Sequence, residues 1–311
     1  MNIEASISNP SELSWLSDVD DAGPQLTQKA PIWVRHFVIR SGPAMGHPER
    51  HPYCELGIHL SGSGVEYVER EKAVRRPGDL FLAGPGVPHW FRMERYPLTG
   101  TVIYFLPHIL CEFGPSNDGL HLLRRFTARR CLEERLVRPP APLRERFLAS
   151  FADIHREFQQ RGLGYEIRLR TVLLEMLVDL VRWEQRVGKT TSDAANMPKW
   201  NDVSRALQYL KEHFAEPVYA HDVAKAVGVS ESRLKVLFRE ALGMPWSRYV
   251  QGYRIQQAVA LLSANDCNVT QAALAVGFES LSHFNATFRS FVGVSPSEYL
   301  KRQQGAAKSR A

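Results

Sequence analysis

The last third of the chain carries basic and amide side chains of the kinds that bind nucleic acid. Lys and Arg neutralise phosphates, and a Lys or Asn that faces the major groove can hydrogen bond to guanine or adenine. Residues 200–302 hold 11 Lys and Arg against 9 Asp and Glu, a net charge of only +2. Charge alone therefore does not predict DNA binding, and any one of these cations is more readily explained as a solvated surface group. The basic candidates are Lys225, Arg233, Lys235, Arg239, Arg248, Arg254 and Arg289.

A pattern of apolar and glycine residues that occurs twice, about fifty residues apart, positions these side chains. Each copy predicts a short helix, a turn at a glycine and a second helix with one apolar stripe, which is the order of a helix-turn-helix. Ser230 is the N-cap candidate for the second helix of the first copy, and Ser280 or Ser282 is the candidate for the second helix of the other copy. A plain helical repeat without a ligand is the alternative. The copies are Ala224, Gly228, Leu234, Phe238, Gly243, Tyr249 and Ala273, Gly277, Phe284, Phe288, Gly293, Tyr299.

The two copies are joined by a predicted apolar-periodic helix over about residues 247–262, which would hold them at a fixed separation. The segments DVAKAVGVSESRLKVLFREALGMPWSRYVQGYRIQQAVALL and VTQAALAVGFESLSHFNATFRSFVGVSPSEYLKR resemble the C-terminal domain of the AraC family of bacterial transcription regulators. The resemblance covers about 100 residues, from 200 to 302. It implies that each monomer places two helices in successive segments of the major groove, about 34 Å apart.

The resemblance also implies which side chains meet the DNA. By the family's pattern, Lys235 is placed to bind guanine and Asn285 to pair with adenine. Many relatives have an arginine at the positions of Val236 and Ala286, so the site that this chain binds is expected to differ from arginine-type sites and to be asymmetric. The base-reading set is Ser232, Lys235, Val236, Ser282, His283, Asn285 and Ala286, and the phosphate-contacting set is Arg233, Arg239 and Arg289.

Residues 31–106 predict an all-β barrel or jelly roll, because short apolar or alternating runs are bounded by Gly, Ser or Pro. The runs are IWVRHFVI, CELGIHL, VEYVER, DLFLAG and TVIYFLP. Two pieces, HPYCELGIHLSGSG from His51 and RPGDLFLAGPGVPHW ending at Trp90, resemble the cupin motifs in the sensor domains of many AraC relatives. The expected fold class is α+β: an N-terminal cupin-like β-barrel with C-terminal helices, joined by a linker to an all-α domain with two helix-turn-helix motifs.

The cupin resemblance implies a set of side chains that could hold a ligand. His51, Glu55 and His89 stand at three positions where metal-binding cupins have ligands, while Glu49 stands where another His is expected. Such groups could hold a divalent transition metal, so a metal-dependent cupin enzyme or metal sensor is the alternative. No cofactor is expected, because most AraC-type sensor domains have no catalytic metal. A small-molecule pocket, suited to a sugar or similar polar effector, is preferred. Its candidate residues are Trp33, His51, Tyr53, Glu55, His89, Trp90 and Tyr104.

Two predicted helices between the barrel and the linker carry regular apolar seams. Phe147, Phe151, Ile154 and Phe158 repeat at steps of four and three. Such a seam is either the packing face against the parent domain or a dimer interface, because steps that average 3.5 residues suit knobs-into-holes packing. We expect the second helix to do both and the chain to form a homodimer. The dimer-interface candidates are Leu169, Leu173, Met176, Leu180 and Trp183.

Composition agrees with a protein of two domains, because 311 residues with 44% hydrophobic content can bury two cores. Four cysteines without a CxxC pair argue against a zinc site and a disulfide framework. The polar, acidic N-terminus does not read as a signal peptide, and no apolar run reaches the length of a membrane span. A cytoplasmic protein without a membrane partner is expected.

The predicted order of domains is an N-terminal arm (1–30), a sensor and dimerisation domain (31–187), a linker (188–198), a DNA-binding domain (199–302) and a basic tail (303–311). This order implies a regulator that binds double-stranded DNA, works with RNA polymerase as an activator and responds to a small-molecule effector. The effector would change how the sensor domain docks on the DNA-binding domain or on a partner subunit. A DNA-repair methyltransferase with a similar helical domain is disfavoured, because no cysteine lies in a reactive motif.

Overall fold

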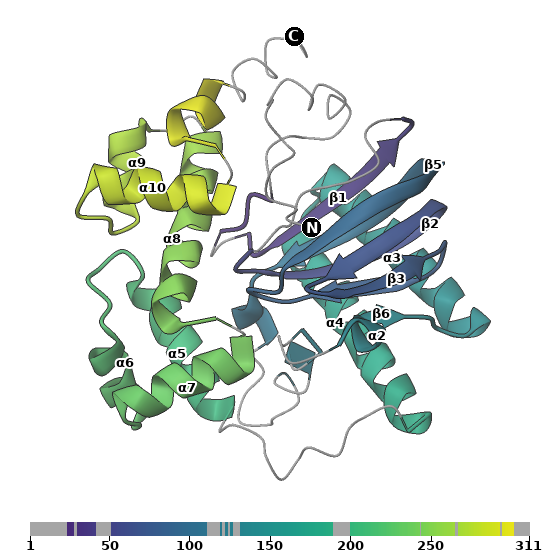
Figure 1. Cartoon of the computed structure of the whole chain (residues 1–311), viewed down its shortest axis with the longest axis horizontal. Coiled ribbons are helices and arrows are strands. Elements are labelled where there is room, and N and C mark those ends of the chain that lie inside the picture. The colour runs from purple at the N-terminus through teal and green to yellow at the C-terminus, as the bar shows by residue number, and fades with distance from the viewer. Residues whose placement is uncertain are drawn as a thin grey trace.

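The computed structural model places a β-sheet with two covering helices beside a helical domain (Figure 1). The N-terminal arm before Pro24, Glu49, most of the predicted linker, Gly243, Gly293 and the basic tail lie outside the described residues. The described residues are 24–27, 30–41, 51–110, 119, 122–123, 125–126, 131–188, 200–242, 244–264, 267–292 and 294–301.

The sensor domain contains one antiparallel six-stranded sheet in the order β1-β5-β2-β4-β6, with β3 paired to β2. All five strand runs expected from the sequence lie in this sheet, but CELGIHL and VEYVER belong to one long strand instead of two. The strands are β1 (Ile32–Ile39), β2 (Cys54–Val68), β3 (Glu71–Arg75), β4 (Leu80–Ala83), β5 (His89–Phe105) and β6 (Leu136–Val137).

The ribbon formed by β2 and β5 bends at a series of register shifts between His59 and Gly64. Extra residues in a ladder increase twist and bend the strand. A Cβ atom at Gly64 would lie 2.2 Å from the Arg92 carbonyl oxygen, so this close approach requires glycine. Among the described strands the hydrogen-bonded path begins at β1 and ends at β6, and the bent, rolled sheet has the cupin-like form expected from the sequence.

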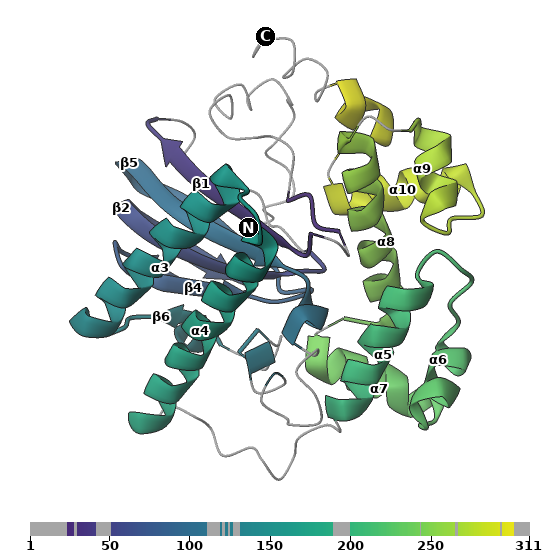
Figure 2. The ribbon, with the colours of Figure 1, turned by 180° about the vertical axis from the view of Figure 1, so that it is seen from behind.

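The two faces of β2 have different surroundings, because successive side chains of a strand alternate. Cys54, Leu56 and Ile58 are fully buried in the core beneath α3 (Ala141–Gln160) and α4 (Tyr165–Arg186), which cross one face of the sheet (Figure 2). Glu55 and His59 point the other way and are buried as well. The bent ribbon therefore encloses polar side chains on the face that the helices leave uncovered.

The predicted dimer seam on α4 is the packing face of the monomer. Four of its residues are at most 2% exposed, and Trp183 packs half-buried against the same core. The packing alternative accounts for this seam, and the assignment to a partner subunit is wrong for these side chains, because the sheet and α3 already cover them. The residues are Leu169, Leu173, Met176, Leu180 and Trp183.

The helical domain has both predicted helix-turn-helix units and the connecting helix. Ser230 and Ser280 accept hydrogen bonds from the backbone N–H three residues further on, at 3.2 and 3.4 Å, so the N-cap of the second unit is Ser280. No described helix is both long and apolar enough to cross a membrane. The helices are α5 (Trp200–His213), α6 (Ala220–Val227), α7 (Glu231–Leu242), α8 (Trp246–Ser263), α9 (Val269–Ala275) and α10 (Leu281–Val292).

One hydrophobic core runs from the sensor domain into the first helix-turn-helix unit. It includes the sheet, the 3-10 helix η3 (Pro107–Leu110), α5, α7 and the first part of α8 as far as Tyr253. The second unit has a separate core that starts at Ile255. Gly252 lies at the domain junction, where a Cβ atom would be 2.8 Å from Pro52. The first unit is therefore packed into the sensor domain, and the second is joined to it through α8.

A buried ion pair stands beneath the bend of the sheet. Arg75 Nη1 donates to Glu66 Oε2 at 3.0 Å, and both side chains are almost fully buried. Burial raises the pKa of Glu66 to about 7, although the Arg75 guanidinium opposes the rise. The folded protein therefore holds a proton on Glu66 at pH values where the unfolded chain has lost it.

This proton predicts a pH dependence of stability. The unfolded carboxyl titrates near 4.5 and the folded one near 7, so the free energy of unfolding should fall between these values and level off above them. The difference in pKa limits the fall to about 3 kcal/mol. Denaturant unfolding of the Glu66→Gln variant in metal-free buffer should lack this slope, whereas exposed Glu94→Gln should keep it. Equal slopes in wild type and Glu66→Gln would contradict the assignment.

Candidate functional site

The two second-helices of the helix-turn-helix units, α7 and α10, present the predicted DNA-facing side chains to solvent. Leu234, Leu237 and Phe238 of α7 are fully buried, and Phe284 and Phe288 take the matching buried positions on α10. Val236 is 45% exposed, which leaves an apolar side chain able to meet a thymine methyl group. All ten predicted DNA-facing residues are exposed: Ser232, Arg233, Lys235, Val236, Arg239, Ser282, His283, Asn285, Ala286 and Arg289.

Two of the base-reading candidates have partners within the chain. Lys235 Nζ lies 2.5 Å from Glu231 Oε1, an exposed pair one helical turn apart. Exposed pairs of this kind contribute little, so Lys235 can exchange Glu231 for a base or phosphate. His283 is held by Gln251, with their side-chain nitrogens 3.3 Å apart, and by the edge of the Phe278 ring. Lys235 therefore remains available to DNA, whereas His283 is bound to its own domain.

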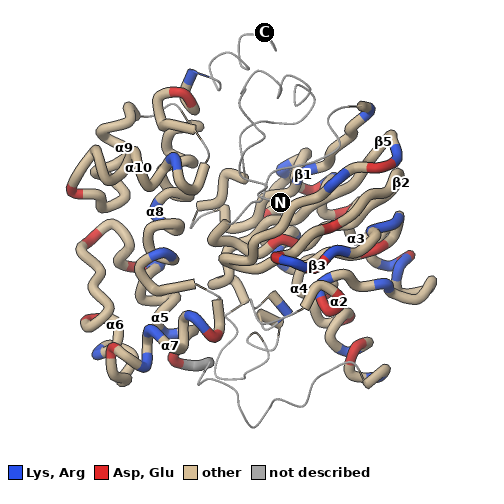
Figure 3. The backbone as a smooth tube through the Cα atoms, in the orientation of Figure 1, with Lys and Arg blue, Asp and Glu red and all other residues tan. Residues whose placement is uncertain are grey.

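Two of the seven basic candidates hold the helices together. Arg254 donates from Nε to the Phe214 carbonyl at 2.8 Å and from Nη2 to the Glu216 carbonyl at 2.6 Å. Arg248 lies 3.8 Å from the centre of the Phe291 ring. These arginines fix α8 against the segment after α5 and against α10, and their role in neutralising phosphates stays a prediction. Figure 3 shows basic and acidic positions interspersed over α5–α7 and few charges along α9 and α10, in agreement with the small net charge.

The second candidate site is a cluster under the bent ribbon of the sensor domain. Glu55 Oε2 on β2 lies 3.4 Å from His51 Nε2 and 3.3 Å from His89 Nε2 on β5. One possible ligand atom from each residue lies within 4.8 Å of the others. All three side chains are buried. The bend of the ribbon thus brings together residues that the sequence separates by up to 38 positions, as the cupin resemblance predicts.

The hydrogen bonds around the cluster fix which nitrogen of each imidazole faces Glu55. His51 Nδ1 lies 2.9 Å from the Tyr53 carbonyl oxygen, and His89 Nδ1 lies 3.1 Å from that of Val87. A carbonyl only accepts, so each neutral ring carries its proton on Nδ1 and turns the Nε2 lone pair toward the carboxylate. Burial alone would raise the pKa of Glu55. When the rings are protonated, Nε2–H hydrogen bonds and the charges of the two imidazoliums outweigh burial and hold the pKa of Glu55 well below its ordinary value.

This donor set fits a divalent transition metal. Three lone-pair groups converge, and without a proton or a cation between them they repel one another. His51 Nε2 makes no well-formed hydrogen bond among the described residues. Metal-binding histidines usually coordinate the ion through one ring nitrogen and donate the other ring N–H to a backbone carbonyl or a carboxylate. Two imidazoles and a carboxylate suit zinc, iron, manganese or nickel.

Three polar residues that the sequence did not single out line the same interior. Arg75 pairs with Glu66, and its Nη2 atom would lie 2.9 Å from a Cβ at Gly57. Arg75 Nε and Nη2 and His59 Nδ1 have no hydrogen-bond partner within the described chain. Burial lowers the pKa of His59, which is therefore neutral. The alternation of Glu55, Gly57 and His59 along β2 was the signal that could have indicated a polar interior.

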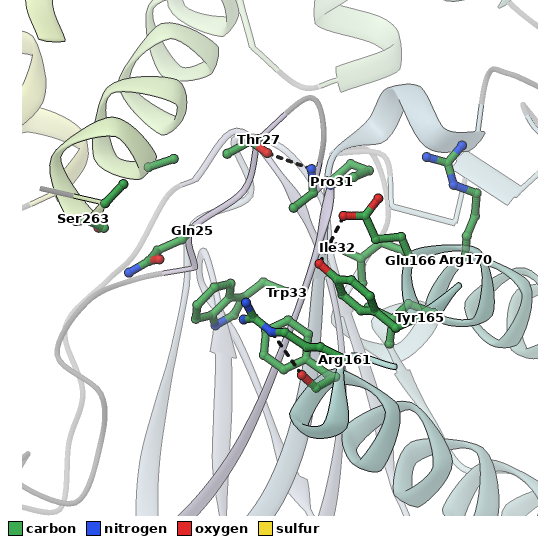
Figure 4. A pocket seen from close by; sticks show the side chains of 15 residues that line it. Gln25, Thr27, Pro31, Ile32, Trp33, Arg161, Tyr165, Glu166, Arg170 and Ser263 are labelled. Carbon is green, nitrogen blue, oxygen red and sulfur yellow. Dashed lines mark hydrogen bonds between the residues drawn. The ribbon is translucent and has the colours of Figure 1, made fainter. Parts of the chain in front are cut away.

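The seven predicted effector residues divide between separate places. Tyr53 stacks on His51 with ring centres 3.9 Å apart and meets the edge of Tyr104, so both belong with the buried cluster. Trp90 instead stacks on Tyr67. Trp33 meets the edge of Phe158 and lines a cavity of about 240 Å³ between the two domains (Figure 4). The prediction of one pocket is wrong, because the sheet directs these side chains to different neighbours.

Known proteins share both halves of this arrangement. Residues 223–302 match a family described as a helix-turn-helix domain, and residues 35–98 match a family described as a cupin domain. The chain is 29% identical over 247 residues to the arabinose operon regulatory protein of Escherichia coli (strain K12), covering 78% of this chain and 79% of that protein. It is 31% identical over 148 residues to the uncharacterized HTH-type transcriptional regulator YdeC of Bacillus subtilis (strain 168), covering 48% of this chain and 50% of that protein.

Solved structures of ToxT from Vibrio cholerae have a similar fold over nearly the whole chain. One has a TM-score of 0.58 at 13% identity and covers 87% of this chain and 98% of ToxT. In this chain the matched fold consists of a cupin domain, a helix hairpin and a pair of helix-turn-helix units. The two matched domains, the solvent-facing second-helices and the similarity to named regulators together make the chain similar to the AraC-type DNA-binding transcriptional regulators.

Proposed function

We propose that the chain is a ligand-responsive transcription regulator whose sensor domain controls how α7 and α10 meet DNA. The observation that carries this proposal is the core that continues from the sheet into the first helix-turn-helix unit. Pro52, which contacts α8 at Gly252, follows His51 of the buried cluster directly in the sequence. A ligand that moves His51 therefore changes the packing at α8, provided that it binds the two arrangements with different affinity.

The relatives support a response to small molecules. One relative is named for the arabinose operon, and one ToxT structure holds an unsaturated fatty acid. For this chain, a polar effector such as a sugar would use His51, Tyr53 and Glu55 through hydrogen bonds and ring stacking. We propose activation, together with RNA polymerase in the cytoplasm, on the family resemblance.

A metal sensor is the second candidate function, and the convergence of His51, Glu55 and His89 favours it. A divalent cation there would replace the repulsion of three lone-pair groups with coordinate bonds, and its charge would balance the buried carboxylate. Because His51 precedes Pro52, a metal ion bound here would affect the contact between Pro52 and α8, as a polar effector would. This cluster thus offers one input for either kind of ligand.

A homodimer is proposed through the outer stripe of α4, which we define as Ile167, Thr171, Leu174, Val178 and Val181. Its residues repeat at steps of four and three, and its three aliphatic members after Thr171 are only half-buried in the monomer. Ile167 is 73% exposed. Steps averaging 3.5 residues suit a helix pair with a second α4. The outer stripe replaces the buried seam as the surface that a partner subunit would cover.

Base reading predicts sequence-specific losses. On a site selected from random duplexes, Lys235→Ala and Asn285→Ala should each weaken binding by about 1–3 kcal/mol and relax the preference at one base pair. Fluorescence anisotropy on that site and on a scrambled duplex measures both effects. Arg239→Ala is the matched control, because a phosphate contact should be lost equally on both duplexes. Equal losses for Lys235→Ala and Asn285→Ala on both duplexes would sink their assignment as base readers.

Metal binding predicts a stoichiometric ion in the purified protein. After dialysis against Zn²⁺, Ni²⁺ or Mn²⁺ and removal of the excess, elemental analysis should find about one ion per chain, since the part of the chain that the structure describes holds one such donor set. His89→Ala and Glu55→Gln should lose it, and binding should release protons at low pH. His59→Ala, a buried histidine outside the donor set, should keep it. Equal metal content in His89→Ala and wild type would contradict the site.

Dimerisation through the outer stripe predicts a change of mass on a charged substitution. Leu174→Glu and Val178→Glu place a carboxylate in the outer stripe, where a partner helix would exclude water, so each should dissociate the dimer. Sedimentation equilibrium gives the mass directly. Val74→Glu, an exposed apolar residue on β3, is the control and should remain dimeric. A monomeric wild type, or a dimer that survives both α4 substitutions, would refute this interface.

A further inference from the structure

The cavity between the two domains has walls from four parts of the chain. One wall is the N-terminal segment around Thr27 and Pro31, a second is β1, and a third is the turn between α3 and α4. The fourth is the end of α8, where Ala260 and Ala264 face the sensor domain. The volume is about 240 Å³ (Figure 4). A molecule that fills this space touches both domains at once.

The N-terminal wall is fixed in place by the sheet. Leu26 is fully buried in the main core. Thr27 and Ala30 close a turn with two hydrogen bonds, one to the Thr27 hydroxyl at 2.7 Å and one to the Ala30 carbonyl at 3.0 Å. Leu106 donates to the Pro31 carbonyl at 3.0 Å, which ties the segment to the end of β5. The cavity is therefore bounded by anchored backbone on this side.

Aromatic and small side chains form the apolar part of the lining. Trp33 and Phe158 meet edge to face with ring centres 5.0 Å apart, and Tyr165 lies on the other side of the turn. Ala260 and Ala264 on α8 leave the space opposite open. Rings prefer edge-to-face and offset contacts with other rings, so a planar ring system suits this wall.

Arg161 is one of the cations that line the cavity, and its backbone conformation is strained. It ends α3 with φ 48° and ψ 42°, a left-handed conformation that favours glycine. Its guanidinium lies 5.1 Å from the centre of the Phe158 ring, and Figure 4 shows it beside the Trp33 indole. A non-glycine residue held in such a conformation is a signal of function where it lines a cavity. Arg161 thus occupies a backbone position suited to glycine, and unlike glycine it brings a positive charge into the cavity lining.

The remaining charges favour an anion. Arg170 is a second cation of the lining, and Glu166 is its acidic residue. The Tyr165 hydroxyl donates to Glu166 Oε1 at 3.1 Å, so one oxygen of that carboxylate already accepts a hydrogen bond within the lining. The lining therefore has a net positive charge beside an aromatic wall.

We propose that this cavity binds a small aromatic carboxylate, with its carboxylate at Arg161 and its ring against Trp33, Phe158 and the alanines of α8. The proposal rests on the proposed function, because it makes this molecule an effector. Its binding requires that the end of α8 stay docked on the sensor domain, so it stabilises the docked arrangement over any other. The site is separate from the His51, Glu55 and His89 cluster and takes a ligand of different chemistry.

Calorimetric titration of the full chain with phenylacetate and indole-3-acetate tests this assignment. Both acids should bind, whereas phenylacetamide and hexanoate, which lack the charge or the ring, should bind at least about tenfold more weakly. Arg161→Gly should lower the affinity by about tenfold or more while the melting temperature holds or rises, since glycine suits this backbone. Ala260→Leu, which fills the cavity from the α8 side, should lower the affinity similarly.

Matched variants separate this site from the rest of the molecule. Arg156→Ala removes an exposed arginine of α3 that pairs with Asp153 and should leave affinity unchanged. Equal affinity in Arg161→Gly and wild type, equal binding of hexanoate, or no heat with either aromatic acid would overturn the proposal. DNA binding without ligand is measured on the same variants. If the wild-type protein binds DNA sequence-specifically but binds neither acid, only this inference fails. If the wild-type protein does not bind DNA sequence-specifically, the proposed function fails.

Discussion

The close approach of Pro52 to Gly252 is the contact on which the relation between sensor and reader depends. A Cβ atom at Gly252 would lie 2.8 Å from Pro52 and 2.9 Å from Phe291, so three segments meet where only a hydrogen fits. The contact stands at the point where α8 leaves the core of the sensor domain at Tyr253 and enters that of the second unit at Ile255. Close-packed interiors transmit strain instead of absorbing it. A shift of Pro52 therefore reaches α8 directly.

Both candidate ligand sites bear on this one helix, at different places along it. His51 of the buried cluster adjoins Pro52, opposite the middle of α8. The interdomain cavity meets the end of α8 at Ala260 and Ala264, about two to three helical turns beyond Gly252 and within the part that packs with the second unit. Neither site touches the DNA-facing side chains of α7 or α10. Ligands at either site would thus act on DNA binding indirectly, through the packing of α8 against the sensor domain.

The sequence predicted the helical domain better than the sensor domain, for a physical reason. Helices such as α7 show their buried face in local spacing, and caps such as Ser230 mark their ends. The bend of β2 depends on long-range pairing with β5, so the sequence predicted two short strands where the structure has one long bent strand. The same limit applies to sites: the cupin motifs brought His51 and His89 together correctly, but nothing local revealed that Arg254 binds backbone carbonyls 38 to 40 residues away.

The different packing of the two readers has a consequence for regulation. The first unit shares its core with the sensor domain, so moving it requires opening a large apolar surface. The second has its own core and is held by α8, with Arg248 and Arg254 as polar braces. Rotation of the second reader about α8 therefore disturbs less buried surface than motion of the first. An effector that locks the end of α8 would fix the spacing of two unlike readers, and hence select the asymmetric DNA sites that both can reach at once.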